Sequence, residues 1–205
     1  MPALDAEHFE FENFVKQKMG VKSDFNLSAE WCFCGRGIPM LYEFLLLKHT
    51  GEKLKDPIRG EDVFLKVKTN AIAKKTINRF LWMLGATLLC NSAVLLPDDG
   101  IVLCGNIINA VLGYMVDDMA DVSTSYFYKG FYGNPKLKSY LETVNIYITS
   151  EADLNLKGCL VCYTSLRDIS GRRTTRTVKS VDGRRTIKNN EDGLNSTHRH
   201  LFSYR

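Results

Sequence analysis

Long uncharged stretches are scarce in this 205-residue chain, and none of them reaches the length of a membrane span. The two longest, residues 80–96 and 101–116, hold 17 and 16 residues, whereas a transmembrane helix needs about 20. Both also contain asparagine, a residue that is costly in a bilayer core. We therefore interpret them as buried elements of a globular fold, and we expect no membrane partner.

A secretory signal is also lacking. The first ten residues include acidic side chains and no apolar core segment. Without a secretory route, the six cysteines are expected to be reduced thiols in the cytoplasm. Cys159 and Cys162 have CxxC spacing, and a single residue separates Cys32 from Cys34. A zinc site, however, needs a second pair of cysteines or nearby histidines. We favour buried thiols over a metal site.

Basic charge is concentrated at the end of the chain. Residues 167–205 hold ten Lys/Arg, four Asp/Glu and few large apolar side chains, which predicts a basic, largely disordered tail. Residues 1–166 carry 17 basic and 19 acidic side chains and are expected to form one globular unit. Pairs such as Arg172-Arg173 can bind nucleic-acid phosphates, but we favour a solvated tail without a nucleic-acid partner.

Helical periodicity dominates the first half of the globular unit. Apolar residues recur at helical spacing, and glycines or polar residues mark the ends of each stretch. A polar linker with Pro57 is expected over residues 53–60. Four helices are predicted here, over residues 7–19, from 28 to the glycines at 35 and 37, over 38–49 and, with the strongest signal, over 69–96.

Strands and helices alternate in the second half. A turn is expected at residues 97–100. After it come a strand at 101–104, helices at 107–119 and 137–141, a strand at 144–149 and a last helix at 154–166. This alternation predicts an α/β fold in which the two strands are parallel and joined by a crossover.

The segment Leu27-Ser28-Ala29-Glu30 places a carboxylate in the first turn of a predicted helix. The partial positive charge of a helix N-terminus favours the ionised carboxylate, which can accept hydrogen bonds from two hydroxyls at once. Such a group is suited to hold a sugar. The alternative, which the residues by themselves favour, is that Glu30 only caps its own helix.

A second candidate is the turn between the strand at 101–104 and the helix that follows. Ligands of α/β sheets sit outside the carboxyl ends of the strands. Gly105 permits close approach of the backbone to a flat ligand, and Asn106 is placed to cap the helix. A plain strand-to-helix turn is the alternative, because Gly and Asn are common in such turns.

Taken in order, these segments resemble the glucokinase family of the bacterial, trypanosomatid and amoebal type. In that family a Val/Leu-Ser-Xaa-Glu segment precedes a Ser-Gly-Xaa-Gly turn and a Leu-Tyr helix. The corresponding residues here are 27–30, the glycines at 35 and 37, and Leu41-Tyr42, with Cys34 where serine is usual.

The likeness continues further along the chain. Residues 101–108 are similar to the family's adenosine motif, a strand that ends in Gly-Gly, although Asn106 stands in place of the second glycine. Residues 144–149 and 154–159 are similar to the family's terminal strand and final helix. The resemblance covers about residues 19–166.

The resemblance implies an α/β fold that is an incomplete large domain of an actin-like ATPase (ribonuclease H-like) fold. It also implies ATP-dependent phosphorylation of glucose to glucose 6-phosphate, with Mg²⁺ accompanying ATP. By this likeness Glu30 binds glucose hydroxyls, and Gly105 and Asn106 lie against the adenosine. No Mg²⁺ ligand can be carried over to this sequence.

The residues that the family uses for phosphoryl transfer are not found in the sequence. These are an Asp-Xaa-Gly-Gly-Thr-Asn hairpin and a Gly-Thr-Gly loop for the phosphates, an Asn-Asp pair with the general base, and a sugar-binding Gly-Glu-Gly-Gly-His segment. Because phosphoryl transfer depends on positioning and charge neutralisation, we expect an inactive part of a glucokinase, without a catalytic residue of its own, that starts just after the last of these segments.

Two further expectations follow from the resemblance. The family's N-terminal strands complete the sheet, and without them an edge and part of an apolar face are exposed. We therefore expect a poorly soluble product or a homo-oligomer. A non-catalytic interaction protein that reuses this half-domain, with a tail that binds nucleic acid, is the alternative to an incomplete kinase.

Overall fold

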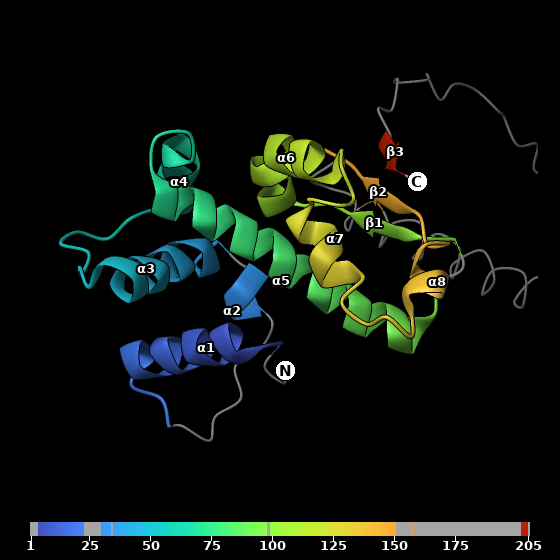
Figure 1. The fold of residues 1–205 in the computed structure, drawn as a ribbon. Helices are drawn as coiled ribbons and strands as arrows, with labels where there is room; N and C mark the ends of the chain where they lie inside the picture. Colours follow the sequence, from blue (N-terminus) through green and yellow to red (C-terminus); the bar gives the residue numbers. More distant parts are fainter. Residues whose placement is uncertain are drawn as a thin grey trace, which may run out of the picture.

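The computed structural model describes residues 4–22, 30–33, 35–97, 99–150, 157 and 202–204. This part of the chain is mostly helical, with one small sheet at one side (Figure 1). The α/β class predicted from the alternating second half is therefore present only in a helix-rich form. The predicted final helix at 154–166, apart from Lys157, and the tail at 167–205, apart from its last strand, lie outside the described residues.

The N-terminal helices agree with the predicted ranges. Helix α1 (Ala6–Met19) begins where the Asp5 carboxylate accepts a 2.7 Å hydrogen bond from the backbone N–H of His8, and it ends at Gly20. Helix α2 (Glu30–Phe33) is followed by α3 (Gly37–Thr50), which ends at Gly51. A non-helical connection then leads to α4 (Gly60–Lys66), a short helix that the sequence did not predict.

Helix α5 (Ala71–Leu95) is the central support of the fold. It begins where the Asn70 side chain accepts a 2.9 Å hydrogen bond from the backbone N–H of Ala73. Its apolar residues recur at helical spacing and are buried against α2, α3, α4, α6 and α7. In the view of Figure 1 it crosses the molecule diagonally between α3 and α7.

Three further helices follow: α6 (Asn106–Met119), α7 (Tyr126–Phe131) and α8 (Lys138–Leu141). Helix α7 was not predicted. Its first turn is fixed by Asp118, whose carboxylate accepts hydrogen bonds from the Ser125 hydroxyl at 2.6 Å and from the backbone N–H groups of Tyr126 and Phe127 at 2.9 and 3.0 Å. The two bonds from backbone N–H groups satisfy donors that a helix N-terminus leaves without intrahelical partners.

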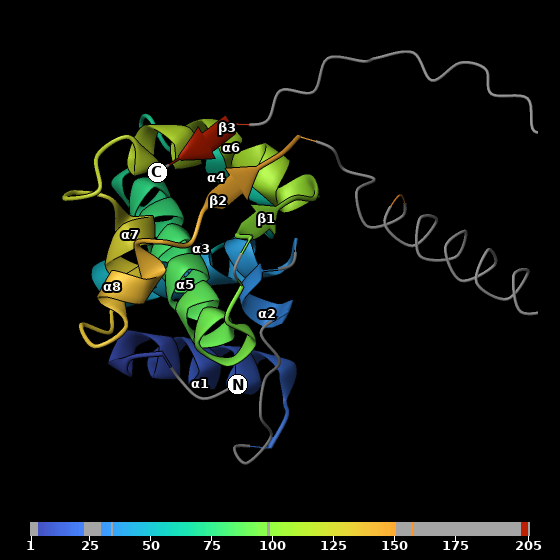
Figure 2. The same cartoon turned by 90° about the vertical axis from the view of Figure 1, so that its right-hand side faces the viewer.

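The sheet holds β1 (Ile101–Leu103), β2 (Ile146–Ile148) and β3 (Phe202–Tyr204) in that order. Strands β1 and β2 are parallel, with Ile101 opposite Ile146, which confirms the predicted parallel pair. Strand β3 comes from the segment predicted as a disordered tail and runs antiparallel to β2. Figure 2 shows the three strands side by side.

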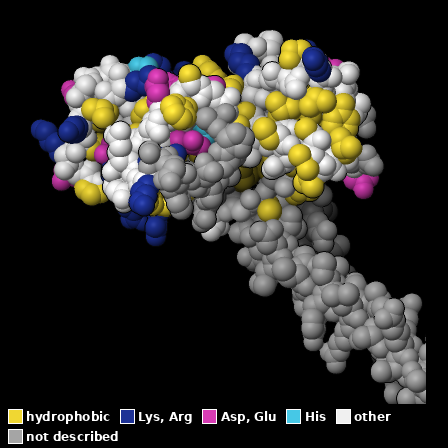
Figure 3. All heavy atoms as spheres, turned by 90° about the horizontal axis from the view of Figure 1, so that it is seen from below, with side chains coloured by type: hydrophobic (Ala, Val, Ile, Leu, Met, Phe, Trp, Pro, Cys, Tyr) yellow, Lys and Arg dark blue, Asp and Glu magenta, His cyan; other side chains and the backbone are white. Residues whose placement is uncertain are grey.

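An apolar surface lies where α5 ends. Val94 and Leu95 in the last turn are 80% and 75% exposed, and Leu96, the residue after the helix, is 57% exposed. Figure 3 shows hydrophobic side chains gathered toward this end of the molecule. Within the described ranges, no helix has both the length and the hydropathy needed to cross a bilayer.

Candidate functional site

Glu30, the predicted sugar ligand, is the first residue of α2. This short helix is held against α5 by the rings of Phe33 and Phe80, whose centroids lie 5.9 Å apart at an edge-on angle of 67°. It also contacts α3. Gly37 makes this contact close, because a Cβ at this position would lie 2.4 Å from the backbone oxygen of Trp31. The second glycine of the family-like turn therefore has a packing role.

A buried histidine–cysteine pair connects α1 to α2. His8 is fully buried, and its Nε2 lies 3.2 Å from the Sγ of Cys32. The other ring nitrogen, Nδ1, accepts a 3.1 Å hydrogen bond from the backbone N–H of Leu4. In the neutral ring the proton is therefore on Nε2, which donates to the sulfur.

Burial sets the charge state of this histidine. Burial, and after it the positive charge of the nearby Arg79 guanidinium, lower the pKa of His8 from 6.5 to about 4. His8 is therefore neutral at pH 7. Sequence reasoning did not find this pair, because the two residues are 24 positions apart and neither belongs to a recognisable motif.

A charged cluster holds α1 onto α5. The Arg79 guanidinium donates to both carboxylate oxygens of Asp5, with one N–O distance of 2.8 Å, and its Nε lies 3.2 Å from Glu7. Burial raises the pKa of Asp5, but the hydrogen bonds from Arg79 and from the backbone of His8 outweigh it, so the pKa is lowered overall. The Asp5 carboxylate thus remains ionised and fixes the start of α1.

Gly105 forms the turn that follows β1. Its φ of 110° and ψ of 170° lie in a region that residues with a side chain rarely adopt. A Cβ built on Gly105 would meet no atom within 4 Å, so the space beside the turn is open. Gly105 is also the N-cap residue of α6, and Asn106 is the first residue inside the helix. The expectation that Asn106 caps α6 is therefore wrong.

The end of β2 is tied to α6 near this turn. The side-chain amide of Asn109 donates a 3.0 Å hydrogen bond to the backbone oxygen of Ser150. Both α2, with Glu30, and α6, with Asn106, contact α5. The two candidate sites therefore share α5 as their support.

Across the described ranges, no three His, Cys, Asp or Glu side chains lie close enough together to hold a metal ion. Cys34, Cys159 and Cys162 lie outside those ranges.

Comparisons with known proteins agree on one family. The glucokinase family model matches residues 2–166. The glucokinases of Neisseria meningitidis serogroups A, B and C are each 28% identical to the chain over 150 residues, which is 72% of the chain and 41% of the relative. The chain thus spans less than half the length of the curated relatives that it matches.

A solved structure is similar in fold over part of its length. The crystal structure of glucokinase from an Antarctic psychrotroph superposes with a TM-score of 0.62, covering 77% of the chain and 45% of that protein. Sequence identity over the match is 17%, so this likeness concerns the fold.

Proposed function

Because the chain belongs to the glucokinase family, we propose that residues 1–166 form the glucose- and adenosine-binding part of a cytoplasmic enzyme that transfers phosphate from ATP to glucose. The single observation that carries this proposal is the family match over residues 2–166. We place the boundary of the unit at residue 166, where that match ends, and treat residues 167–205 as a basic tail outside the family match, although its strand β3 pairs with β2.

We assign glucose binding to Glu30. Its position at the start of α2 supports this role, because backbone N–H groups at a helix start have no intrahelical partner and favour a nearby carboxylate. An ionised carboxylate accepts hydrogen bonds from two neighbouring sugar hydroxyls. The contacts of α2 with both α3 and α5 support a fixed position for this residue.

We assign contact with the adenosine of ATP to Gly105 and Asn106. The turn lies at the carboxyl end of β1, where ligands of α/β sheets bind. The open space beside Gly105 leaves room for a flat base against the backbone. Asn106 is exposed at the start of α6 and offers an amide that can both donate and accept. Mg²⁺ accompanies ATP in this proposal, and we assign no residue of this chain as its ligand.

Binding of glucose can be tested without turnover. In saturation-transfer NMR with millimolar glucose, the wild-type chain is expected to give a glucose signal that Glu30→Gln abolishes. Glu61→Gln is the matched control, because Glu61 also lies in the first turn of a short helix and contacts Arg59 at 3.1 Å. An equal signal from wild type and Glu30→Gln would contradict the assignment of Glu30.

The adenosine assignment has its own test. A valine at residue 105 would combine a strained φ with a side chain in the open space beside the turn. Gly105→Val is therefore expected to remove the saturation-transfer signal of adenosine. Gly51→Val is the control, since Gly51 also has a positive φ and open surroundings but ends α3. Retention of the adenosine signal in Gly105→Val would contradict the proposal.

A further inference from the structure

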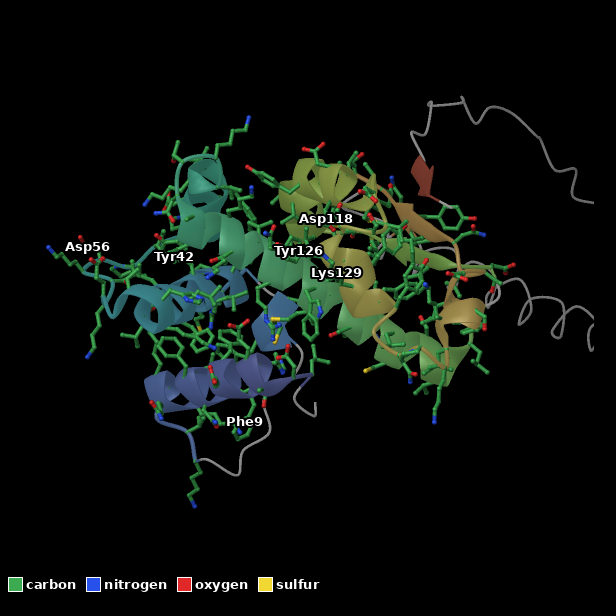
Figure 4. All side chains as sticks on the ribbon, viewed as in Figure 1. Phe9, Tyr42, Asp56, Asp118, Tyr126 and Lys129 are labelled. Atoms are coloured by element: carbon green, nitrogen blue, oxygen red, sulfur yellow. The ribbon has the colours of Figure 1, made fainter. Side chains whose placement is uncertain are left out.

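A cleft of about 400 Å³ opens between α1, α3, α5 and α7. Leu45, Trp82 and Tyr126 contribute apolar surface to it, and Lys75, Arg79 and Lys129 contribute positive charge. Glu30, Gly105 and Asn106 do not line it. Its volume falls within the range of small-molecule sites. Figure 4 shows Tyr126 and Lys129 close together on α7, where that helix lies over α5.

The cations of the cleft divide into two kinds. Arg79 is neutralised by Asp5 and Glu7, and Glu7 also contacts Lys48 at 3.2 Å. In the part of the chain that the structure describes, neither Lys75 nor Lys129 has a carboxylate within ion-pair distance. The cleft therefore carries two positive charges that no described side chain neutralises.

Both lysines keep donor hydrogens for a ligand. The Nζ of Lys75 lies 3.2 Å from Nε2 of His49, and the Nζ of Lys129 donates a 2.8 Å hydrogen bond to the backbone oxygen of Thr124. An ammonium group has three donor hydrogens. Each lysine thus has further hydrogens that can point to an anion, one from α5 and one from α7.

The remaining surface suits a ring. The Arg79 guanidinium carbon lies 4.3 Å from the centroid of the Trp82 ring, which fixes the position of the indole. Tyr126 is 41% exposed, and the Nζ of Lys129 lies 5.0 Å from the centroid of its ring. Two aromatic side chains beside two unneutralised ammonium groups form a surface that matches a ligand with one apolar part and one anionic part.

We propose that this cleft binds a small phosphomonoester that carries a ring with an apolar face. The phosphate lies between Lys75 and Lys129, and the ring lies against Trp82 and Tyr126. This site is additional to the proposed glucose and adenosine sites and does not depend on them. A phosphate dianion pairs with two ammonium groups at once, so loss of either lysine weakens binding about tenfold, the effect of one charge-assisted hydrogen bond.

The indole N–H signals of the two tryptophans provide a direct test with phenyl phosphate as the probe. In ¹⁵N-labelled full-length chain, the signal of Trp82, assigned with Trp82→Phe, is expected to shift saturably, while that of Trp31 is unchanged. Inorganic phosphate and phenol, each lacking one part of the probe, are expected to bind at least tenfold more weakly. Absence of a saturable shift at Trp82, or equal shifts at both indoles, would overturn the proposal.

Substitutions separate this site from general attraction of anions. Lys75→Gln with Lys129→Gln is expected to weaken phenyl phosphate binding by about a hundredfold. The control is Lys74→Gln with Lys138→Gln, which removes the same charge from exposed lysines outside the cleft. All four lysines are exposed, so unchanged melting temperatures are expected. Equal affinities of the two double variants for phenyl phosphate would refute a specific phosphate site at Lys75 and Lys129.

Discussion

Gly85 of α5 and Gly130 of α7 allow the backbones of the two helices to touch, each glycine facing the other helix's main chain. A Cβ on Gly85 would lie 2.1 Å from the backbone oxygen of Phe127, and a Cβ on Gly130 would lie 2.1 Å from that of Trp82. Real Cβ atoms essentially never lie within 3.0 Å of a non-neighbouring backbone atom. This crossing determines where α7 places Tyr126 and Lys129.

Alanine at either glycine is expected to destabilise the fold. Because a backbone atom and not a flexible side chain is in the way, Gly85→Ala or Gly130→Ala should lower the free energy of unfolding by roughly 3 kcal/mol. Gly113 provides the control, since it lies in α6 with no atom within 4 Å of its added Cβ. Gly113→Ala should instead stabilise by about 0.5–1 kcal/mol. Urea unfolding monitored by circular dichroism measures the free energy of unfolding of all three variants. A Gly85→Ala variant as stable as the wild type would contradict the close backbone contact between α5 and α7.

The buried His8 ring should make stability depend on pH. Its pKa is about 4 in the folded chain against 6.5 when unperturbed, so the unfolded chain binds more protons between these values. The free energy of unfolding should therefore fall as pH decreases from about 6.5 to about 4, by at most about 1.4 kcal/mol per pH unit. Asp5, with its lowered pKa, adds to the loss at the acid end.

Replacement of the histidine isolates its contribution. His8→Gln keeps a side-chain N–H that can donate to Cys32 but does not titrate. Urea unfolding of this variant should show a smaller slope between pH 6.5 and 4 than the wild type. Parallel curves for the two proteins would contradict a neutral, buried His8.

Leu96 has a left-handed backbone at the end of α5. Its φ of 47° is the single positive value among the described non-glycine residues. Such a conformation costs a residue with a side chain roughly 1 kcal/mol, and the Leu96 side chain is more than half exposed. Leu96→Gly should therefore raise the free energy of unfolding by about 1 kcal/mol. Leu95→Gly, one residue earlier inside the helix, should lower it by about the same amount. Destabilisation by both changes would contradict this reading of the helix end.

The exposed end of α5 should promote self-association. Val94, Leu95 and Leu96 are adjacent and exposed, and contiguous apolar surface favours contact between molecules. Leu95→Lys is expected to shift the protein toward smaller species in light scattering. Leu65→Lys is the control, because Leu65 is also highly exposed, at 80% against 75% for Leu95, but belongs to another helix, α4. A wild-type chain that is monomeric at high concentration would contradict the expectation.

The long helices could be predicted from the sequence, as could the short elements α2, α8, β1 and β2, but helices α4 and α7 could not. Helices α1, α3 and α5 have 14, 14 and 25 residues, enough for apolar residues to repeat over several turns. Helices α4 and α7 have seven and six, too few for a period to be visible. Their ends depend on contacts such as Asp118 with Tyr126, eight residues apart.

Among the site residues, those in local motifs could likewise be predicted from the sequence, and those brought together by packing could not. Glu30 and Gly105 could be predicted as site residues because each stands in a local motif beside a helix start, and these assignments stay predictions. The contact between His8 and Cys32, and the cleft to which Tyr126 and Lys129 contribute, join segments that are distant in the sequence. No local pattern encodes these contacts, because they arise from how α1 and α7 pack on α2 and α5.

The central proposal is that these 205 residues carry ligand-binding parts of a glucokinase without its phosphoryl-transfer groups. A general base alone contributes on the order of 10²-fold or more to the rate, and the phosphate-binding loops contribute further. The most direct measurement is a coupled assay of glucose 6-phosphate formation by the purified 205-residue chain with glucose, ATP and Mg²⁺. We predict a rate equal to the protein-free background at every chain concentration. A rate that rises in proportion to the chain and is lost in Glu30→Gln would contradict the claim.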